Sequence, residues 1–492
     1  MQHRDIIFST MHNNALSPAD IADSRILGMF DPQQFRNTGH ALIDLLADYL
    51  ATNMEGTGKV IDWVPPHLAE LDWLAPLPQH PVLNPTDLLE RLRHEILPGT
   101  LAIHHPHNLG HQVAAPLPLA ALCDLVAALA NQAMAVYETG PSATLLERQV
   151  IRWLGELIGW KNVEGVLTSG GAQANLTALL AARQHSADWD IWQKGVSAGR
   201  PLRILASEHA HYSISRAAGI MGLGANAVVK VAADAEGRMD IAALQQAHRE
   251  AIEQGTIVMA VVATAGCTPT GSVDPLSSVG AYCRQHNLWL HVDGAHGASA
   301  LLSPIYREAL SGIEYADSVV WDGHKLLYMP AAVSAVLFQK PEHANEAFAQ
   351  EASYLFQGSS HGDETYNTSY RTLECTKRMM GLKLWAAFSL YGREGIALLV
   401  ERVFGTARLL AQKLEQAEDF ECLMPPQTNI VCFRLRGADQ ASLRSAVIEA
   451  GAFHVTQVTL RDEVWLRTTI MNPLTTEKDL DELLETLRRR AT

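Results

Sequence analysis

Between about residue 140 and residue 340, short apolar runs alternate with segments that have the spacing of amphipathic helices. "GVLTSG" precedes the helix-like "GAQANLTALLAAR", and "RILAS" precedes "HYSISRAAGIMG". Continuous apolar runs are typical of strands buried on both faces, and parallel strands need crossover connections, which are usually helical. The alternation therefore predicts an α/β fold in which helices cover both faces of a mostly parallel sheet.

The segments on either side of this region have different patterns. Residues 30–112 contain helix-like stretches broken by Pro-rich connectors, and the chain from about residue 386 offers a helix, two strand-like runs and a closing helix. A chain of 492 residues is long enough for more than one domain. We predict an N-terminal helical arm over residues 1–112, a large domain over 113–385 and a small α+β domain over 386–492.

The composition of the chain argues against some classes of binding partner and indicates the cellular compartment. The formal net charge of -15 argues against a nucleic-acid partner and against binding to an anionic membrane surface. Six scattered cysteines without a CxxC pair are typical of reduced thiols, and the N-terminus has no apolar signal sequence. The apolar tract 114–136 is interrupted by Pro116, Pro118 and Asp124, which favours a buried helix over a membrane span. We expect a cytoplasmic protein.

Small residues follow the first of the predicted strands. In "LTSGGAQANL", Gly170, Gly171 and Ala172 leave backbone N–H groups uncovered at the start of a helix, an arrangement that suits a phosphate. A tight turn that requires glycine would explain the same residues, and the spacing of neither a P-loop nor GxGxxG is present. Open α/β sheets bind ligands beyond the carboxyl ends of their strands, which is where this turn lies.

Two groups of histidines raise the question of a metal site. His209 and His211 follow a predicted strand, and "IHHPHNLGHQ" contains four more histidines, including His111. Neither group has a third or fourth ligand at ordinary zinc spacing, so we predict no metal here. For His211, stacking on a flat ligand stays open.

A single acid and a single amine end two other apolar runs. Asp293 closes "LWLHVD" and Lys325 closes "SVVWDGHK". A buried carboxylate needs a cationic partner, and a desolvated lysine amine is a nucleophile toward carbonyl groups. For an isolated acid and amine, a structural ion pair between the two is the simpler interpretation.

The combination of these features along one sheet favours a cofactor. A phosphate turn, an aromatic neighbour, a buried acid and a buried lysine match the phosphate, ring, protonated ring nitrogen and aldehyde of pyridoxal 5'-phosphate. We therefore predict that Asp293 and Lys325 contact this cofactor rather than each other.

With these motifs, the chain resembles the group II pyridoxal-phosphate amino-acid decarboxylases, the family of glutamate, aromatic-amino-acid and diaminobutyrate decarboxylases. The likeness covers most of the chain and is carried by "FDPQQFRNTGHALIDLLADYL", "HPHNLGHQVAAPLP", "TSGGAQANLTALLAAR", "SEHAHYSISRAA", "HVDGAHGA", "DGHK", "LECTKR" and "LRTTIMNP". It implies an aspartate-aminotransferase-like fold (fold type I) with a seven-stranded sheet, and a homodimer with active sites at the subunit interface.

The resemblance also implies which residues contact the cofactor ring. Lys325 condenses with the aldehyde, and Asp293 keeps the ring nitrogen protonated so that the ring can accept electrons. Ala295 packs on one face of the ring and His211 stacks on the other. Thr268 lies near the ring substituents.

Further residues are implied at the two ends of the bound molecule. Gly171 and Ala172 give backbone N–H groups to the phosphate, helped by His324. At the substrate end, His111 lies in the segment that faces the substrate, and Arg467 binds a substrate carboxylate, for which the two-pronged geometry of arginine is suited.

The sequence departs from the family pattern at two places. The mobile loop of the family usually presents a tyrosine that protonates the intermediate, but the aligned position here is Gly362, so His361 or Tyr366 would have to replace it. Asp322 stands where many relatives have a neutral residue near the phosphate, and its charge would weaken cofactor binding unless it meets a cation.

The expected activity is α-decarboxylation of an L-amino acid to an amine and carbon dioxide. "ASYLFQ", "YNTS" and "GHQVAAPLP" resemble the glutamate and diaminobutyrate enzymes, which favours a small polar or acidic substrate. Three alternatives stay open: an aromatic-amino-acid decarboxylase, an aldehyde synthase that depends on decarboxylation, and an aminotransferase.

Overall fold

The computed structural model describes residues 18–348 and 363–491, and the chain divides into two compact units. The first unit holds Met1–Asn53 and Val64–Thr100, and the second holds Met54–Trp63 and Leu101–Thr492. We predicted a helical arm over 1–112, a large domain over 113–385 and a small domain over 386–492, and these boundaries stay a prediction. In the structure, residues 101–112 belong to the second unit.

The first unit is helical, and prolines mark where its helices begin. α1 spans Pro18–Met29, α2 Pro32–Met54, α3 Pro66–Ala69 and α4 Pro85–Arg91. Proline suits the first helical position because its missing N–H would have no partner there. α4 also has a capping box, in which the Asn84 side chain accepts from the backbone N–H of Asp87 and the Asp87 side chain accepts from that of Asn84.

A seven-stranded sheet forms the centre of the second unit. Its strand order is β1-β7-β6-β5-β4-β2-β3, and only β7 runs antiparallel to its neighbours. This arrangement confirms the prediction of a mostly parallel sheet. The strands are β1 Glu164–Thr168, β2 Leu202–Ser207, β3 Val228–Val231, β4 Ile257–Thr264, β5 Leu290–Asp293, β6 Ser318–Asp322 and β7 Ser334–Phe338.

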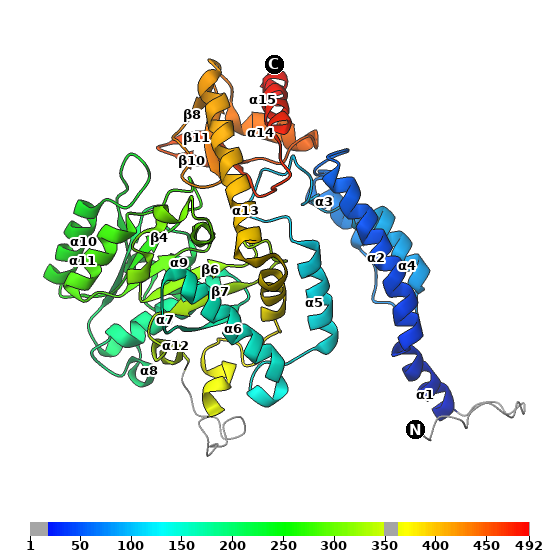
Figure 1. Ribbon diagram of the computed structural model, residues 1–492, viewed down its shortest axis with the longest axis horizontal. Helices are drawn as coiled ribbons and strands as arrows, with labels where there is room; N and C mark the ends of the chain where they lie inside the picture. The colour runs from blue at the N-terminus through cyan, green and yellow to red at the C-terminus, as the bar shows by residue number, and fades with distance from the viewer. Residues whose placement is uncertain (1–17, 349–362, 492) are drawn as a thin grey trace, which may run out of the picture. The chain divides into compact units, whose positions relative to one another are not determined.

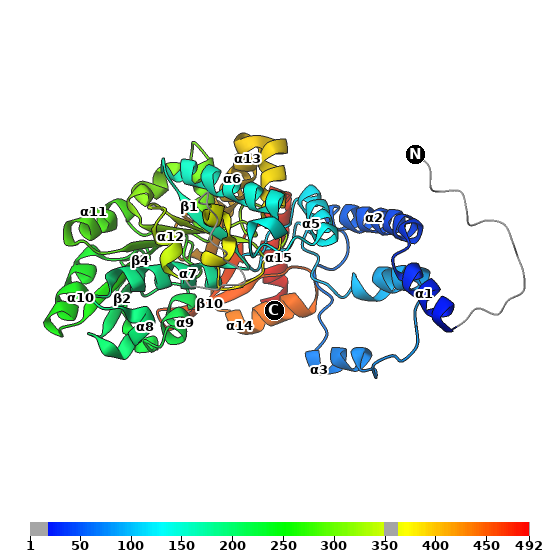
Figure 2. The same cartoon turned by 90° about the horizontal axis from the view of Figure 1, so that it is seen from below.

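Both faces of this sheet are apolar, as the unbroken apolar runs require. Val261 and Ala263 of β4 face one core, which α6, α10, α11 and α13 complete. Their neighbours Ala260 and Val262 face the other core, with α7 and α9. Figures 1 and 2 show these helices around the sheet. The helices that cover the sheet are α6 Pro141–Ile158, α7 Gly171–Ser186, α9 Ser213–Ile220, α10 Ile241–Glu253, α11 Leu276–His286 and α13 Gly381–Gln416. The second unit also contains α5 Pro118–Ala130, α8 Ile191–Lys194 and α12 His343–Glu346.

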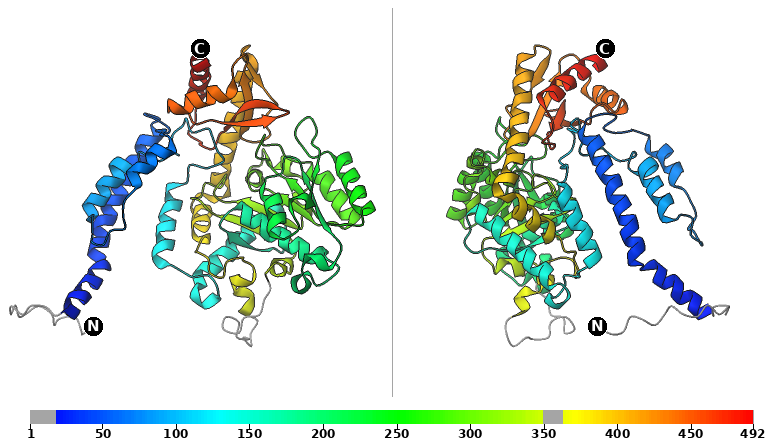
Figure 3. Two further views of the ribbon diagram at one scale, coloured as in Figure 1. Left: turned by 180° about the vertical axis from the view of Figure 1, so that it is seen from behind. Right: turned by 45° about the vertical axis from the view of Figure 1, so that its right-hand side comes forward.

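A smaller antiparallel sheet follows near the C-terminus. Its order is β10-β11-β9-β8, from β8 Phe420–Cys422, β9 Ile430–Leu435, β10 Thr456–Leu460 and β11 Glu463–Thr469. α14 Gln440–Glu449 and α15 Glu477–Ala491 accompany it, and α13 runs from the large sheet toward it (Figure 3). α13 is broken at Gly392, whose φ of 66° lies in the left-handed region that glycine adopts without strain.

The stretch "HPHNLG" is hydrogen-bonded to this C-terminal part. Leu109 donates its N–H to the His454 carbonyl and accepts from the N–H of Thr469, and His454 donates to the His107 carbonyl. The same segment then reaches the large sheet region, where Leu117 N–H donates to the Tyr328 carbonyl. It therefore links the two sheets.

Candidate active site

The strand ends of the large sheet open onto one cavity. β1, β2, β4, β5 and β6 all end at the same edge of the sheet, because β7 is antiparallel to both β1 and β6. The cavity has a volume of about 290 Å³. Its lining residues are Gly170, Gly171, Ala172, Asn175, His211, Tyr212, Thr264, Gly266, Thr268, Asp293, Ala295, His296, Asp322, His324 and Lys325.

The start of α7 forms one end of the cavity. Gly171 is the first helical residue, and the first-turn N–H groups of a helix have no partner within it. A Cβ atom at Gly171 would lie 3.0 Å from Asp322 Oδ1, so a side chain here would press against the Asp322 carboxylate. The N–H groups and the positive end of the helix dipole therefore face a space that suits an anion.

Asp293 is held by donors from two elements. Asn175 Nδ2 donates to Asp293 Oδ2 over 3.0 Å, and the backbone N–H of Ala295 donates to Oδ1 over 3.2 Å. Asp293 is buried at 5% exposure and yet lines the cavity. Each carboxylate oxygen has a further lone pair, which can accept a proton donor placed in the cavity.

A buried chain of hydrogen bonds orients Asn175. Trp289 Nε1 donates to Ser318 Oγ (3.0 Å), and Ser318 Oγ bonds to His291 Nδ1 (2.9 Å). His291 Nε2 bonds to Asn175 Oδ1 (2.9 Å). Because an amide oxygen only accepts, Nε2 carries the proton and the Ser318 hydroxyl donates to Nδ1. Burial lowers the pKa of His291 to about 4, in agreement with this neutral ring.

His211 reaches the same network through Ser213. Asn175 Nδ2 donates to Ser213 Oγ (2.9 Å), and both the hydroxyl and the backbone N–H of Ser213 lie within 3.3 Å of His211 Nδ1. Nδ1 therefore acts as acceptor, and the proton of the neutral ring lies on Nε2. Burial lowers the pKa of His211, against the opposing effect of Asp293.

Lys325 pairs with Asp322 in this structure. Its Nζ lies 3.1 Å from Asp322 Oδ2, and His324 Nε2 lies 3.6 Å from the same oxygen. The hydroxyl of Ser334 donates to Oδ1 over 2.5 Å. The Asp322 charge thus meets a cation, and Asp293 and Lys325 have different partners, so the simple ion pair between these two is not what forms.

Three predicted residues do not line the cavity. His111 is exposed, with its ring 5.4 Å from that of His454. Tyr366, at the end of the short helix Asp363–Tyr366, packs against Tyr137 and under Arg148. Arg467 lies on β11. His361 and Gly362 lie outside the described residues.

Arg467 is a buried arginine on β11. It is 5% exposed, and its Nη1 donates to Thr456 Oγ1 over 3.2 Å. Its Nε and Nη2 are buried and have no hydrogen-bond partner within the described parts of the chain. Burial lowers the pKa of Arg467. Burial is also the main cause that lowers the pKa of His296, which lines the cavity, and the charges of Lys325 and Arg467 lower it further. An unpaired buried guanidinium close to a cavity is a site for an anionic group.

The sequence reasoning missed Asn175, Ser213 and His291. Two of them carry a recognisable signal. Asn175 is four residues after Gly171, hence on the same side of α7, and His291 precedes Asp293 by two, hence on the same face of β5. Polar residues at these spacings from a predicted site residue would have been candidates.

Comparison with known proteins identifies the family. A model of the pyridoxal-dependent decarboxylase conserved domain matches residues 65–436. The chain belongs to the pyridoxal-dependent decarboxylase family. Cysteine sulfinic acid decarboxylase of Homo sapiens is 34% identical over 347 residues, 70% of each chain. The acidic amino acid decarboxylase GADL1 of Mus musculus is 29% identical over 446 residues, 87% of this chain and 80% of that protein.

Solved structures of the decarboxylase family have the same fold. Mouse cysteine sulfinic acid decarboxylase superposes with a TM-score of 0.87 at 29% identity, over 94% of this chain and 100% of that one. The glutamate decarboxylase domain of a diaminobutyrate-pyruvate transaminase and L-2,4-diaminobutyrate decarboxylase from Vibrio parahaemolyticus gives 0.81 at 26% identity, over 98% and 97%. The predicted fold and family are confirmed.

The protein is therefore an amino-acid decarboxylase that uses pyridoxal 5'-phosphate. The cavity fits this cofactor, because a helix start without a side chain at Gly171, a buried carboxylate at Asp293 and an amine at Lys325 lie around one space. In the described residues, no helix has the length and apolar character needed to cross a membrane.

Proposed function

We propose that this enzyme decarboxylates a small acidic L-amino acid, of the kind that cysteine sulfinate and aspartate represent. The observation that carries the proposal is the buried guanidinium of Arg467, whose Nε and Nη2 lack partners among the described residues. The relatives support the same class of substrate, since their names describe decarboxylases of cysteine sulfinic acid and of acidic amino acids.

We propose that Arg467 serves the substrate end of the cavity, and a chain of contacts supports this. His296 lines the cavity and bonds through Nε2 to Asn429 Oδ1 over 2.6 Å, and Asn429 Nδ2 donates to the Ile470 carbonyl beside β11. This chain of contacts ties the cavity wall to the strand that carries Arg467. A substrate carboxylate could accept hydrogen bonds from both Nε–H and Nη2–H, in the bidentate geometry that arginine favours.

For the cofactor we propose the roles that the cavity geometry supports. When bound, pyridoxal 5'-phosphate supplies an electron sink for the bond that breaks. The N–H groups of Gly171 and Ala172, with His324, hold its phosphate, and Asp293 holds the ring nitrogen in its protonated form. Lys325 Nζ is the amine that attaches it.

The remaining side chains position the ring and handle protons. Ala295 and His211 would face the two sides of the ring, with Thr268 at its edge, since all three line the cavity. Because His211 Nδ1 already accepts from Ser213, the N–H at Nε2 is the one that can donate to a group bound in the cavity. By holding the substrate in one orientation, the protein would decide which bond at the α-carbon breaks, so orientation is its main contribution. Protonation by His361 or Tyr366 stays a prediction, as does a substrate contact of His111.

Replacing Arg467 tests the proposal. Arg467→Met should lower kcat/KM for cysteine sulfinate and aspartate by about 10²- to 10³-fold, because a buried charged hydrogen bond to the substrate is lost. Arg467→Lys should recover only part of this, since lysine lacks the two-pronged geometry. Steady-state kinetics over a panel that includes glutamate, 2,4-diaminobutyrate and tyrosine is the measurement.

The matched control is Arg434→Lys on the neighbouring strand β9, where the side chain pairs with Glu421 at the surface. It should leave kcat/KM unchanged. The proposal is wrong if Arg467→Met decarboxylates acidic substrates like the wild type, or if the wild type prefers an aromatic amino acid.

We further propose that the enzyme acts in the cytoplasm as a homodimer with shared active sites. α5 buries Ala120 and Ala127 but exposes a stripe of large apolar side chains on another face, which a second copy of this chain would cover. The stripe consists of Leu122, Leu125, Val126 and Leu129, at the i, i+3, i+4 and i+7 spacing of one helix face.

Charges on this stripe should break the dimer. The double variant Leu125→Asp with Leu129→Asp should sediment as a monomer at micromolar concentration and lose most of its activity, whereas the wild type should sediment as a dimer. Ile252→Asp, on an exposed position of α10, is the control and should stay dimeric. A wild type that sediments as a fully active monomer would refute the proposal.

A further inference from the structure

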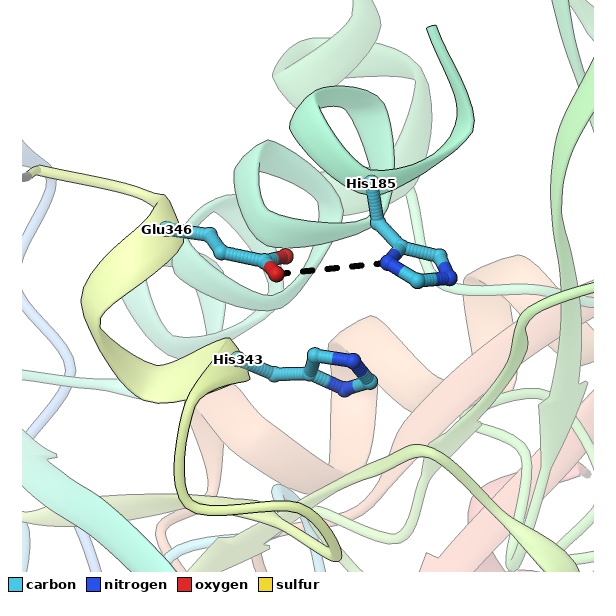
Figure 4. Close-up of side chains that lie close together, drawn as sticks. All are labelled: His185, His343 and Glu346. Carbon is cyan, nitrogen blue, oxygen red and sulfur yellow. Dashed lines mark ion pairs between the residues drawn. The ribbon is translucent and has the colours of Figure 1, made fainter.

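Two histidines and a glutamate from distant parts of the chain lie together outside the cavity. His185 comes from the last turn of α7, and His343 and Glu346 come from the four-residue helix α12. One potential ligand atom of each lies within 4.8 Å of those of the other two. Figure 4 shows the Glu346 carboxylate directed toward the ring of His185, with the ring of His343 beside them.

Ordinary hydrogen bonding does not account for this group. Glu346 Oε2 and His343 Nδ1 are buried, and neither has a hydrogen-bond partner within the described residues. His185 Nδ1 is 3.9 Å from Glu346 Oε1, too far for a hydrogen bond. A buried carboxylate oxygen without a donor is costly, and burial accordingly raises the pKa of Glu346.

Aromatic packing explains the rings but not the carboxylate. Trp289 lies 4.7 Å from the His343 ring and 5.5 Å from the His185 ring, measured between centroids. Phenylalanine in place of His185 or His343 would pack against Trp289 equally well. It gives no reason for a glutamate whose oxygen turns inward at the same point.

The surrounding charges favour a cation. Outside the group, the carboxylates of Asp317 and Glu342 interact electrostatically with its members, as does the amine of Lys340, so among these described neighbours negative charge exceeds positive. His343 Nδ1 has no hydrogen-bond partner among the described residues, so this nitrogen is available to bind an ion.

We propose that His185, His343 and Glu346 bind a divalent transition-metal ion, with Zn²⁺ as the best match. Two imidazoles and one carboxylate are a common zinc ligand set, and a water molecule would complete a tetrahedron. Ligand atoms around such an ion lie about 3.4 Å apart, so groups within 4.8 Å reach it by small side-chain rotations. His343 and Glu346 are three residues apart on α12 and thus point to the same side.

The site is structural rather than catalytic. His185 lies fourteen positions along α7 from Gly171, which at 1.5 Å per residue places it about 21 Å from the phosphate end of the cavity. The ion therefore takes no part in the reaction. It ties α12, which follows β7, to the far end of the helix whose first turn faces the cofactor phosphate.

Metal binding by the holoenzyme tests the proposal directly. After treatment with a chelator and gel filtration, the wild type should take up one Co²⁺ per chain and develop the visible bands of a tetrahedral complex. Zn²⁺ should displace the Co²⁺ and raise Tm by about 3 °C or more. Glu346→Gln and His343→Phe should each weaken Co²⁺ binding by roughly a hundredfold, while His343→Phe keeps the aromatic packing against Trp289.

The control is His80→Ala, an exposed histidine of the first unit, which should bind Co²⁺ like the wild type. Circular dichroism of each variant without metal shows whether it is folded, and the Zn²⁺-induced change in Tm compares each with itself. Equal Co²⁺ binding by wild type, Glu346→Gln and His343→Phe would overturn the proposal. So would a wild type without a Co²⁺ spectrum or Zn²⁺-induced Tm shift at millimolar metal.

Discussion

Lys325→Ala is expected to reduce decarboxylation by at least about 10⁴-fold, because it removes the amine that we propose would attach the cofactor. Lys325 Nζ lies 3.1 Å from Asp322 Oδ2, so an alternative role would be to neutralise that buried carboxylate. Lys325→Arg separates the two roles, since arginine keeps the positive charge but does not condense with an aldehyde at neutral pH. Both variants should be inactive in a carbon dioxide release assay.

Covalent attachment gives an independent measurement. After borohydride reduction and proteolysis, the cofactor mass should be on the peptide that contains Lys325 in the wild type, and on no peptide of Lys325→Ala. Lys230→Ala, at an exposed position on β3, is the control and should be fully active. An active Lys325→Arg enzyme would mean that the ion pair with Asp322, not the nucleophile, is what the reaction needs.

Asp293→Asn should have the second largest effect, a fall in kcat of about 10²- to 10³-fold together with weaker cofactor binding. Asparagine keeps an oxygen that can accept from Asn175 Nδ2 or the Ala295 N–H, so the local fold is retained. The variant loses the negative charge that, in our proposal, would keep the ring nitrogen protonated and so maintain the electron-accepting strength of the ring. Rate assays at saturating cofactor and titration of the cofactor-free enzyme measure the two effects separately.

Two further variants control the Asp293 result. Asp188→Asn removes an exposed carboxylate that pairs with Arg200 and should change neither quantity. Asn175→Ala leaves the Asp293 charge but removes its donor, so it should lower kcat less than Asp293→Asn does. If Asp293→Asn kept the wild-type kcat, Asp293 would be a structural residue and the proposed arrangement of the ring would be wrong.

The main architecture was predictable because the large sheet is buried on both faces. Strands such as β4 must then be continuously apolar, and that pattern is visible in a single sequence. The same logic pointed to Asp293, which ends one such run, and to Lys325, which lies three residues beyond the end of another. Strand ends in a parallel sheet meet at one edge, so proximity along the sheet could be inferred without coordinates.

The features of the site that could not be predicted from the sequence depend on contacts between segments that are distant along the chain. The pairing of Lys325 with Asp322 depends on the turn after β6, and the orientation of Asn175 depends on a chain of hydrogen bonds through His291 to Ser318. That Arg467 is buried without a carboxylate partner among the described residues follows from the packing of the C-terminal sheet, which no local pattern encodes. The group formed by His185 and Glu346 joins α7 to α12 in the same way.

The most direct test of the account is product analysis with an amino acid labelled with ¹³C at its α-carboxyl carbon. Incubation of the holoenzyme with labelled cysteine sulfinate or aspartate should give ¹³CO₂ and the corresponding unlabelled amine in equal amounts, with no carbonyl product. Lys325→Ala and Asp293→Asn should each suppress both products together. A keto acid that retains the label, or an aldehyde released with the ¹³CO₂, would contradict the assignment of this cavity to simple decarboxylation of an acidic amino acid.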